Sequence, residues 1–407
     1  MITFLYILSG IIQSLLVLAA IYYLYISSFS LIRFRHSNNS SKENSFAIVV
    51  AAHNEKEVIG DLIESLKELD YPKDKYDIFI VADNCTDNTG EIAEEMGVNV
   101  IRRNDTEKRG KGYALEYAFN HIMSLEKKYD FFTVFDADNL VKPDFLRCMN
   151  NKLNEGYEAV QGYLDSKNPY DSMQTFSYSL WYWLNNRCSQ LARNNLKYGA
   201  RLGGTGFAVS VSLIKEYGWG ATCLAEDAEF TLKLALNDIK VGWAHDAVIY
   251  DEKPLGVETS WHQRTRWVQG LNDVSKRYIL PLFKKAIKEK KILPLHMIMN
   301  FWGDSLHSAS LIYMLAVRIL LFFFAGGIVT YLWAPLTMRI LLDAVLILSF
   351  LVFMAVLYED KKLSVKILTN FIGFIVWMLS WIPIGINAVV KKNTNQWFHT
   401  PHKSNKK

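Results

Sequence analysis

The sequence is poor in the residues and motifs that mark several common protein classes. Its 407 residues include only 4 cysteines, Cys85, Cys148, Cys188 and Cys223, and none of these has CxxC or metal-ligand spacing. We therefore expect isolated thiols in a reducing compartment. The net charge of +4 is too small to predict a nucleic-acid surface. The chain also lacks a GxxxxGKS/T sequence, which argues against a P-loop ATPase transporter.

Long apolar runs, by contrast, are plentiful at both ends of the chain. They cover residues 3–27, 306–333, 340–358 and 367–390. Each has about the length that crosses a bilayer, which needs about 20 residues. We expect an N-terminal transmembrane anchor within residues 1–35 and transmembrane helices within 306–390. Residues 40–290, rich in charge and turn residues, form the predicted soluble domain, and a possible interfacial helix at 293–305 follows it.

Basic residues predict which side of the membrane the soluble domain occupies. Arg33, Arg35 and Lys42 follow the first apolar run, and lysines are dense in 284–291, just before the second. The positive-inside rule places both flanks, and so the domain, in the cytoplasm, which predicts a multi-pass protein of the plasma membrane. The tail 391–407 is also basic, although three crossings would leave it outside. Either one segment does not cross, with a break at Trp381-Ile382-Pro383 as one option, or a further span exists.

Strands and helices alternate through the first half of the soluble domain. Apolar strands end in "AAHNE", "VADN" and "FDADN", and amphipathic or short helical segments separate them. This alternation predicts an α/β fold with a mostly parallel sheet covered on both faces. Ligands of such sheets bind beyond the carboxyl ends of the strands. We therefore expect the polar clusters that follow the three strands to converge at one edge.

Asp136 and Asp138 follow the apolar strand "FFTVF" and are one residue apart. Burying two carboxylates costs several kcal/mol unless something compensates. On a strand, residues i and i+2 point the same way, so both could aim into one cleft. This pair suits Mg²⁺ or Mn²⁺, hard ions that bind one or two carboxylates plus substrate phosphates. The alternative is a solvated, Asp-rich turn.

Three features of the later half could complete such a site. The stretch "LGGTGFAVS" has glycines around Thr205, which allow close approach to a ligand or simply form a turn. Glu226 and Asp227 head an amphipathic stretch, where carboxylates could serve chemistry or only cap a helix. In "WHQRTRWVQG", Gln263, Arg266 and Trp267 share one helical face. An amide, a guanidinium and an indole suit a diphosphate and a flat sugar, whereas a surface arginine beside a core tryptophan is the alternative.

Taken in order, these motifs resemble those of the family 2 glycosyltransferases, specifically the membrane-embedded synthases of cellulose, hyaluronan, chitin and poly-N-acetylglucosamine. The matching elements are "AAHNE", "VADN", "GKG", "DAD", "AED" and "QRTRW". The resemblance spans roughly residues 45 to 270, together with the layout of one anchor before the domain and a helical bundle after it. It implies a GT-A-like nucleotide-sugar-binding domain joined to transmembrane helices.

The resemblance also implies a role for individual residues. His53, Glu55 and Asp83 would hold the uridine, and the imidazole of His53, where many relatives have an aromatic such as Tyr, can stack on uracil. Lys111 would approach the sugar nucleotide, and Asp136 and Asp138 would bind the diphosphate and its Mg²⁺ or Mn²⁺. Asp227 would be the general base. Contacts with the diphosphate and the acceptor sugar would come from Gln263, Arg266 and Trp267.

One base and no second carboxylate nucleophile predict single displacement with inversion. We expect a UDP-sugar donor, and a growing β-linked polysaccharide that is extended processively and moved across the membrane. The alternatives are transfer of one sugar to a lipid carrier, giving a glycolipid product, and a catalytically inactive nucleotide-sugar sensor coupled to a membrane bundle. The sugar, the linkage and any accessory subunit stay open.

Overall fold

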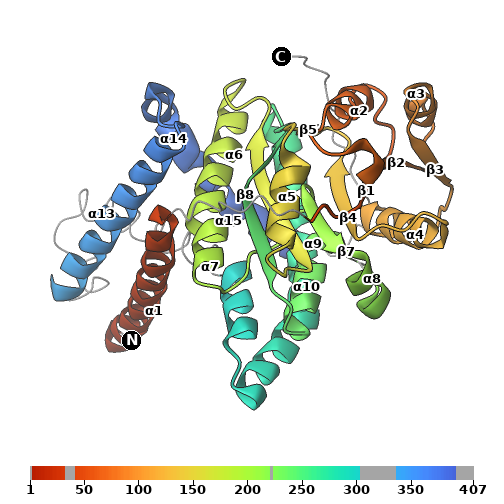
Figure 1. Cartoon of the computed structure of the whole chain (residues 1–407). Helices are drawn as coiled ribbons and strands as arrows, with labels where there is room; N and C mark the ends of the chain where they lie inside the picture. Colours follow the sequence, from red (N-terminus) through yellow and green to blue (C-terminus); the bar gives the residue numbers. More distant parts are fainter. Residues whose placement is uncertain (1, 33–41, 221–222, 303–335, 391–407) are drawn as a thin grey trace.

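The computed structural model describes residues 2–32, 42–220, 223–302 and 336–390. Its centre is one sheet of eight strands in the order β3-β2-β1-β4-β7-β6-β8-β5 (Figure 1). The strands are β1 (Phe46–Ala52), β2 (Tyr76–Asp83), β3 (Asn99–Arg103), β4 (Phe131–Asp136), β5 (Leu140–Val141), β6 (Ala159–Ser166), β7 (Phe207–Ser210) and β8 (Val241–Asp251).

The two halves of the sheet differ in strand direction. Strands β3, β2, β1 and β4 pair in parallel, as the alternation of strands and helices predicts. Strand β7 runs antiparallel to both β4 and β6, and β5 runs antiparallel to β8, whereas β6 and β8 are parallel. The predicted α/β fold is therefore correct, and the parallel arrangement holds fully for the half that ends in the three polar clusters.

Helices cover both faces of the sheet. They are α2 (Ile59–Lys67), α3 (Thr89–Glu95), α4 (Lys111–Ser124), α5 (Phe145–Leu153), α6 (Met173–Leu184), α7 (Ala192–Asn195), α8 (Val211–Tyr217), α9 (Glu226–Leu236) and α10 (Val257–Glu289), with short helical turns η1 (Phe29–Leu31) and η2 (Lys73–Lys75) and the π-helix η3 (Asn185–Leu191). One apolar core packs α4, α6, α8 and α9 against the sheet. A second core packs α2, α3 and α5 against the opposite face.

The side chains of strand β1 alternate between the two cores. Ala47 and Val49 belong to one core, whereas Ile48 and Val50 belong to the other, and all four are fully buried. Successive side chains of a strand point to opposite faces, so a continuous apolar run is what a strand covered on both faces needs. The polar residues begin only where the strand ends.

Apolar helices flank the domain at both ends of the chain. They are α1 (Ile2–Ser28), a helix over Ile292–Trp302, α13 (Leu336–Glu359), α14 (Val365–Leu379) and α15 (Trp381–Val390). Among the described residues, two stretches are long and apolar enough to cross a membrane, Ser14–Leu31 and Val365–Val390. The predicted runs 3–27 and 340–358 lie in α1 and α13, and the run 367–390 is divided at Ser380 between α14 and α15. The predicted run 306–333 and the tail 391–407 lie outside the described residues, and the number of crossings stays a prediction.

A buried arginine joins the flanking helices to the domain. The Arg187 side chain in η3 is inaccessible to solvent and lies 2.6 Å from Glu359 and 2.5 Å from Asp360, at the end of α13. It also donates a hydrogen bond of 2.8 Å to the carbonyl of Ser30, just after α1. Arg187 therefore ties the ends of α1 and α13 to one point of the domain.

Gly162 lies where the β6–β8 register shifts and has no room for a side chain. A β-carbon at this position would lie 2.7 Å from the carbonyl oxygen of Ala247 and 2.9 Å from that of Gly206. We expect Gly162→Ala to lower the free energy of unfolding by about 1–3 kcal/mol, because backbone atoms on both neighbouring strands would have to move. Thermal unfolding followed by circular dichroism measures this, with Gly60→Ala in α2 as the control, since its nearest neighbour is a flexible methionine sulfur at 3.8 Å. Equal melting temperatures for wild type and Gly162→Ala would contradict the prediction.

Candidate active site

The loops after β1 and β2 lie side by side and are bonded to each other. The His53 ring nitrogen Nδ1 lies 2.7 Å from the carbonyl oxygen of Asp83, and the Glu55 amide donates a 2.8 Å hydrogen bond to Thr89 Oγ1. The Thr86 amide donates to the Asn54 side chain at 2.7 Å. Strands β1 and β2 are neighbours in the sheet. The structure therefore brings His53, Glu55 and Asp83 together, as the sequence predicts for residues at the carboxyl ends of adjacent strands.

Asp83 has a buried partner that the sequence analysis missed. Arg103, the last residue of β3, lies 2.5 Å from the Asp83 carboxylate, and both side chains are less than a tenth exposed. Burial raises the pKa of Asp83, and the hydrogen bond from Arg103 works against that rise. The signal in the sequence is weak, because it consists only of an arginine at the end of the strand that neighbours β2. Arg103 fixes the direction of the Asp83 carboxylate.

The two aspartates of the DAD motif differ in their surroundings, and one prediction about them is wrong. Strand β4 ends at Asp136, so Asp138 lies in the following turn and not on the strand. The Asp138 side chain is buried, accepts a hydrogen bond of 3.1 Å from Asn139 and lies 3.4 Å from the backbone amide of Glu252. Strand periodicity therefore does not account for the direction of the Asp138 side chain. The turn and the residues that follow β8 determine it instead.

Behind this turn stands the glycine-rich loop that precedes β7. Thr205 Oγ1 accepts a 3.0 Å hydrogen bond from the Asp136 amide and donates its own proton to the Asn139 side chain, with an oxygen–oxygen distance of 2.5 Å. Gly204 and Gly206 have φ of 84° and 61°, the left-handed region in which glycine is unstrained. The loop therefore brings its backbone up to the DAD turn, as the glycine content predicts.

Lys111, at the start of α4, connects the DAD turn to the head of α9. Its ammonium forms an ion pair with Asp136, donates a hydrogen bond of 2.7 Å to the Gly204 carbonyl and lies 3.9 Å from Glu226. A β-carbon on Gly204 would lie 3.6 Å from Asp227 Oδ2. Asp136, Lys111 and Asp227 therefore meet around Gly204, although they come from segments far apart in the sequence.

The charged side chains around Lys111 shift one another's pKa values. Burial would lower the pKa of Lys111, but Asp136 and Glu226 outweigh it, and the pKa is raised. Burial raises the pKa of Glu226 to about 7, with Lys111 opposing and Asp227 adding to the rise. Burial also raises the pKa of Asp227, while the Ala228 backbone amide and Lys111 oppose it. A carboxylate whose pKa approaches neutral is suited to accept a proton.

A second buried ion pair borders the other side of the DAD turn, and the sequence analysis missed it too. Lys253 and Asp251, at the end of β8, lie 2.6 Å apart, and the Lys253 ammonium lies 3.5 Å from the centre of the Tyr182 ring. Burial raises the pKa of Asp251 to about 6, and the negative charge of Asp138 contributes to the rise. The only sign in the sequence is the charged run "DEK" after an apolar strand.

The predicted QxxRW element lies on α10, as its spacing indicates. Arg266 donates a 3.5 Å hydrogen bond to the Leu224 carbonyl, just before the head of α9. Trp267 meets Tyr178 edge to face, with ring centres 6.0 Å apart. Gly270 packs so closely on the AED segment that a β-carbon there would lie 2.7 Å from the Ala225 β-carbon. Helix α10 therefore lies directly against the segment that carries Asp227, with Gln263 half-buried on it.

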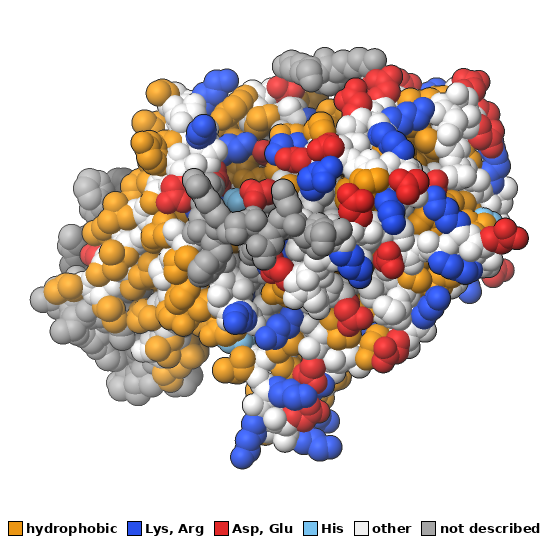
Figure 2. All heavy atoms as spheres, viewed as in Figure 1, with side chains coloured by type: hydrophobic (Ala, Val, Ile, Leu, Met, Phe, Trp, Pro, Cys, Tyr) orange, Lys and Arg blue, Asp and Glu red, His pale blue; other side chains and the backbone are white. Residues whose placement is uncertain are grey.

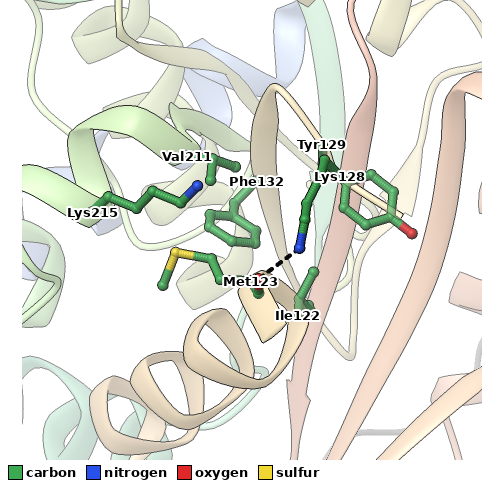
Figure 3. A pocket seen from close by; sticks show the side chains of 7 residues that line it. All are labelled: Ile122, Met123, Lys128, Tyr129, Phe132, Val211 and Lys215. Atoms are coloured by element: carbon green, nitrogen blue, oxygen red, sulfur yellow. Dashed lines mark hydrogen bonds between the residues drawn. The ribbon is translucent and has the colours of Figure 1, made fainter. Parts of the chain in front are cut away.

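A small hollow elsewhere in the domain is too small for a nucleotide or a sugar. It is lined by Ile122, Met123, Lys128, Tyr129, Phe132, Val211 and Lys215, and its volume is about 20 Å³ (Figure 3). A cavity of this size holds about one water molecule. It lies between α4 and α8, away from the carboxylates that surround Lys111 at the strand ends.

The residues at the DAD turn fit a divalent cation that also binds a substrate. Among the described residues, no group of three or more His, Cys, Asp or Glu side chains is arranged to hold a metal ion. Asp136 and Asp138 offer carboxylate oxygens, the ligands that Mg²⁺ and Mn²⁺ prefer, and such ions complete their shell with water and substrate phosphates. The ammonium of Lys111 beside Asp136 indicates that this position already favours positive charge.

Comparison with known proteins agrees with this geometry. Residues 43–270 match the model of the glycosyltransferase-like family 2, and the chain belongs to this family. The fold resembles a mannosyltransferase from Pyrobaculum calidifontis solved with GDP-Man and Mn²⁺, with a TM-score of 0.58 and 18% identity over 96% of this chain and 100% of that one. The domain therefore has the GT-A-like fold expected from the sequence.

Three curated relatives differ in how much of the chain they share. A probable glycosyltransferase of Bacillus subtilis, YdaM, is 29% identical over 61% of this chain and 59% of its own length. A β-monoglucosyldiacylglycerol synthase of Synechocystis is 28% identical over 55% of this chain and 47% of its own length. A poly-β-1,6-N-acetyl-D-glucosamine synthase of Staphylococcus epidermidis is 26% identical over 92% and 89%. The chain thus spans about half to three fifths of the length of the first two relatives.

We expect Glu226 to make stability fall as pH rises. Its folded-state pKa of about 7 lies above the ordinary 4.5, so the folded state binds the proton more tightly, and that stabilisation is lost between about pH 4.5 and 7. Glu226→Gln removes the titrating group, so its melting temperature should fall less than that of wild type between pH 5 and pH 8. Glu95→Gln, at an exposed position at the end of α3, is the control. If Glu226→Gln and wild type lose the same number of degrees, Glu226 does not titrate in this range.

Proposed function

We propose that this protein transfers a sugar from a UDP-sugar to a β-linked acceptor, with inversion at the anomeric carbon, at the cytoplasmic face of the plasma membrane. The observation that carries the proposal is the position of Lys111 between Asp136 and the head of α9. This position brings the proposed diphosphate site, at Asp136, close to the proposed carboxylate base, Asp227. Single displacement needs both groups on either side of the reacting carbon.

The uridine is assigned to the loops after β1 and β2. The contact between His53 Nδ1 and the Asp83 carbonyl fixes the plane of the imidazole, which can then stack on a flat base. Arg103 holds the Asp83 carboxylate in place to accept hydrogen bonds from the nucleoside. Glu55 follows His53 in the same bonded loop and completes this subsite.

The diphosphate is assigned to the DAD turn and to α10. Mg²⁺ or Mn²⁺, bound with the diphosphate at Asp136 and Asp138, would supply Lewis-acid stabilisation of the leaving group. Lys111 contributes a fixed positive charge at the same place, and Arg266 lies on the helix that packs against α9. Preorganised charges of this kind lower the barrier because they need no reorganisation when the bond breaks.

Asp227 is the proposed general base. It is half-buried at the start of α9, and burial raises its pKa above that of an ordinary aspartate, which makes its carboxylate a better proton acceptor. In the reaction the acceptor hydroxyl gives its proton to Asp227 as its oxygen bonds to the anomeric carbon. The bond from that carbon to the diphosphate breaks on the opposite face, and UDP leaves. Trp267 and Gln263 are assigned to the acceptor sugar.

A growing polysaccharide is the acceptor we propose, with processive extension and coupled translocation. The poly-N-acetylglucosamine synthase relative aligns over most of this chain, whereas the glycolipid synthase relative aligns over little more than half. The glycolipid synthases are the reason to keep transfer to a lipid acceptor as the second candidate. An inactive sensor is disfavoured by the complete set of acidic groups around Lys111.

Exposed apolar side chains support a membrane location. Leu368 and Ile372 of α14 are 75% and 76% exposed, and Ile347 of α13 is 60% exposed. Apolar side chains gather on the part of the surface formed by α1, α13 and α14, whereas charged side chains cover the opposite part (Figure 2). Monomeric soluble proteins rarely expose apolar patches of this extent, and lipid is the partner that we propose for it.

The decisive experiment incubates the purified full chain with Mn²⁺ and UDP-N-acetylglucosamine or UDP-glucose and then digests the product with linkage-specific hydrolases. We expect transfer with one of these donors. Asp227→Asn should lower turnover by about 10²-fold or more, while UDP binding measured by calorimetry persists, because the base is not needed for binding.

Asp77→Asn is the matched control, because Asp77 lies at the opposite end of β2, where it accepts a 2.6 Å hydrogen bond from Tyr129. Loss of UDP binding together with turnover in Asp227→Asn would assign Asp227 to the donor site. No turnover with any UDP-sugar, combined with metal-independent UDP binding, would favour the sensor.

A further inference from the structure

Arg264 is a buried cation inside the QxxRW element that neither the family motif roles nor the proposed mechanism uses. Its side chain is 1% exposed, whereas the flanking Gln263 and Arg266 are half-buried. Removing a guanidinium from water costs several kcal/mol unless its donors are satisfied. No ion pair with a carboxylate is found for Arg264 in the described part of the chain. Its Nε donates a 3.3 Å hydrogen bond to the Ser260 carbonyl within α10, and its other partners lie on a segment more than a hundred residues further along.

Those partners form the break between α14 and α15. Arg264 Nη1 donates a 3.2 Å hydrogen bond to the Trp377 carbonyl and a 2.7 Å hydrogen bond to Ser380 Oγ. The guanidinium also lies 4.9 Å from the centre of the Trp377 ring and 5.3 Å from that of Trp381. A planar guanidinium can satisfy a helix C-terminus and two aromatic faces at once, which an ammonium cannot.

This contact has a consequence for Trp267. The Trp267 and Trp381 rings lie 6.5 Å apart with an angle of 22° between their planes. Trp381 in turn meets Trp377 edge to face at 5.7 Å. The Trp267 indole, which we assign to the acceptor, therefore lies next to aromatic side chains of α14 and α15. These two helices make up Val365–Val390, a stretch that is apolar and long enough to cross a membrane.

The other side of α10 is fixed as well. Gly270 packs against Ala225, two residues before Asp227, without room for a β-carbon. Helix α10 is thus held at two points about two turns apart, by the α14–α15 break and by the head of α9. A shift at the first point would change where Gln263, Arg266 and Trp267 stand relative to Asp227.

We propose that Arg264 is a positioning residue that locks the QxxRW helix to the α14–α15 break and so sets the acceptor sugar, bound at Trp267 and Trp381, in line with Asp227. The inference rests on the proposed function, since it assumes that transfer to an acceptor occurs beside Asp227. Arg264 itself touches neither substrate. The proposed uridine and metal subsites, built on β1, β2 and β4, lie outside α10, and only the Arg266 contribution to the diphosphate comes from this helix.

The test measures acceptor and donor properties separately in the full chain in lipid nanodiscs with Mn²⁺. The acceptor probe is a β-1,6-linked N-acetylglucosamine tetrasaccharide, and the donor probes are UDP and UDP-N-acetylglucosamine. We expect Arg264→Gln to raise the acceptor KM and the ratio of donor hydrolysis to transfer by about tenfold or more, which corresponds to about 1.4 kcal/mol. The Kd for UDP should rise less than about threefold, because the uridine and metal subsites stay in place and only Arg266 shifts with α10. Arg264→Lys should recover part of the loss, because an ammonium keeps the charge and one hydrogen bond.

Two further variants keep the result interpretable. Ser380→Ala removes the 2.7 Å acceptor of Arg264 without touching α10, and it should shift the same two quantities by about threefold if Arg264→Gln does not fold. Arg147→Gln, which breaks a surface ion pair with Asp70 on the far side of α5, is the charge-matched control and should match wild type.

One outcome would contradict the positioning role of Arg264, and a different outcome would contradict the proposed function. If the Arg264 and Ser380 variants keep the wild-type acceptor KM and hydrolysis ratio, or lose UDP binding in parallel with transfer, the positioning role is wrong while the proposed function stands. If wild type itself neither binds UDP nor uses the donor, the proposed function fails, and the positioning role falls with it.

Discussion

The contact on which the site depends is the ammonium of Lys111 between the DAD turn and the head of α9. Asp136, Gly204 and Glu226 come from three separate segments, and Lys111 lies within bonding or near-bonding distance of each. Without a positive charge there, the neighbouring Glu226 and Asp227 would repel one another, and burial, which already raises the pKa of both, would favour their neutral forms further. The same charge is what a diphosphate requires. One side chain therefore offsets the repulsion between these carboxylates and supplies a positive charge where we propose that the diphosphate binds.

The second constraint is the placement of α10 between the domain and the C-terminal helices. Its QxxRW face looks toward the AED segment, and its buried Arg264 faces the α14–α15 break. Arg187 makes a comparable contact between the domain and the ends of α1 and α13. In both cases a buried guanidinium satisfies backbone carbonyls of a flanking helix. The domain and its apolar helices are therefore joined through fixed polar contacts.

Much of this arrangement could be predicted from the sequence, and the rest could not for identifiable reasons. His53, Asp83 and Asp136 converge because strands β1, β2 and β4 are adjacent, which alternation of strands and helices predicts. Asp138 was assigned to the strand, but the strand ends at Asp136, and a turn is invisible to a period-two argument. Arg103, Lys253 and Arg264 were missed, because each acquires its role from a buried partner that only the folded chain brings near.

The most direct measurement of the central claim is Mn²⁺ binding followed by electron paramagnetic resonance, with and without UDP. Asp136 and Asp138 are the two carboxylates of the DAD turn, and Asp136 already forms an ion pair with Lys111. The account predicts that the free Mn²⁺ signal changes little with protein alone, drops when UDP is added, and stays high with UDP in Asp138→Asn. Equal Mn²⁺ binding with and without UDP, or an unchanged drop in Asp138→Asn, would contradict it.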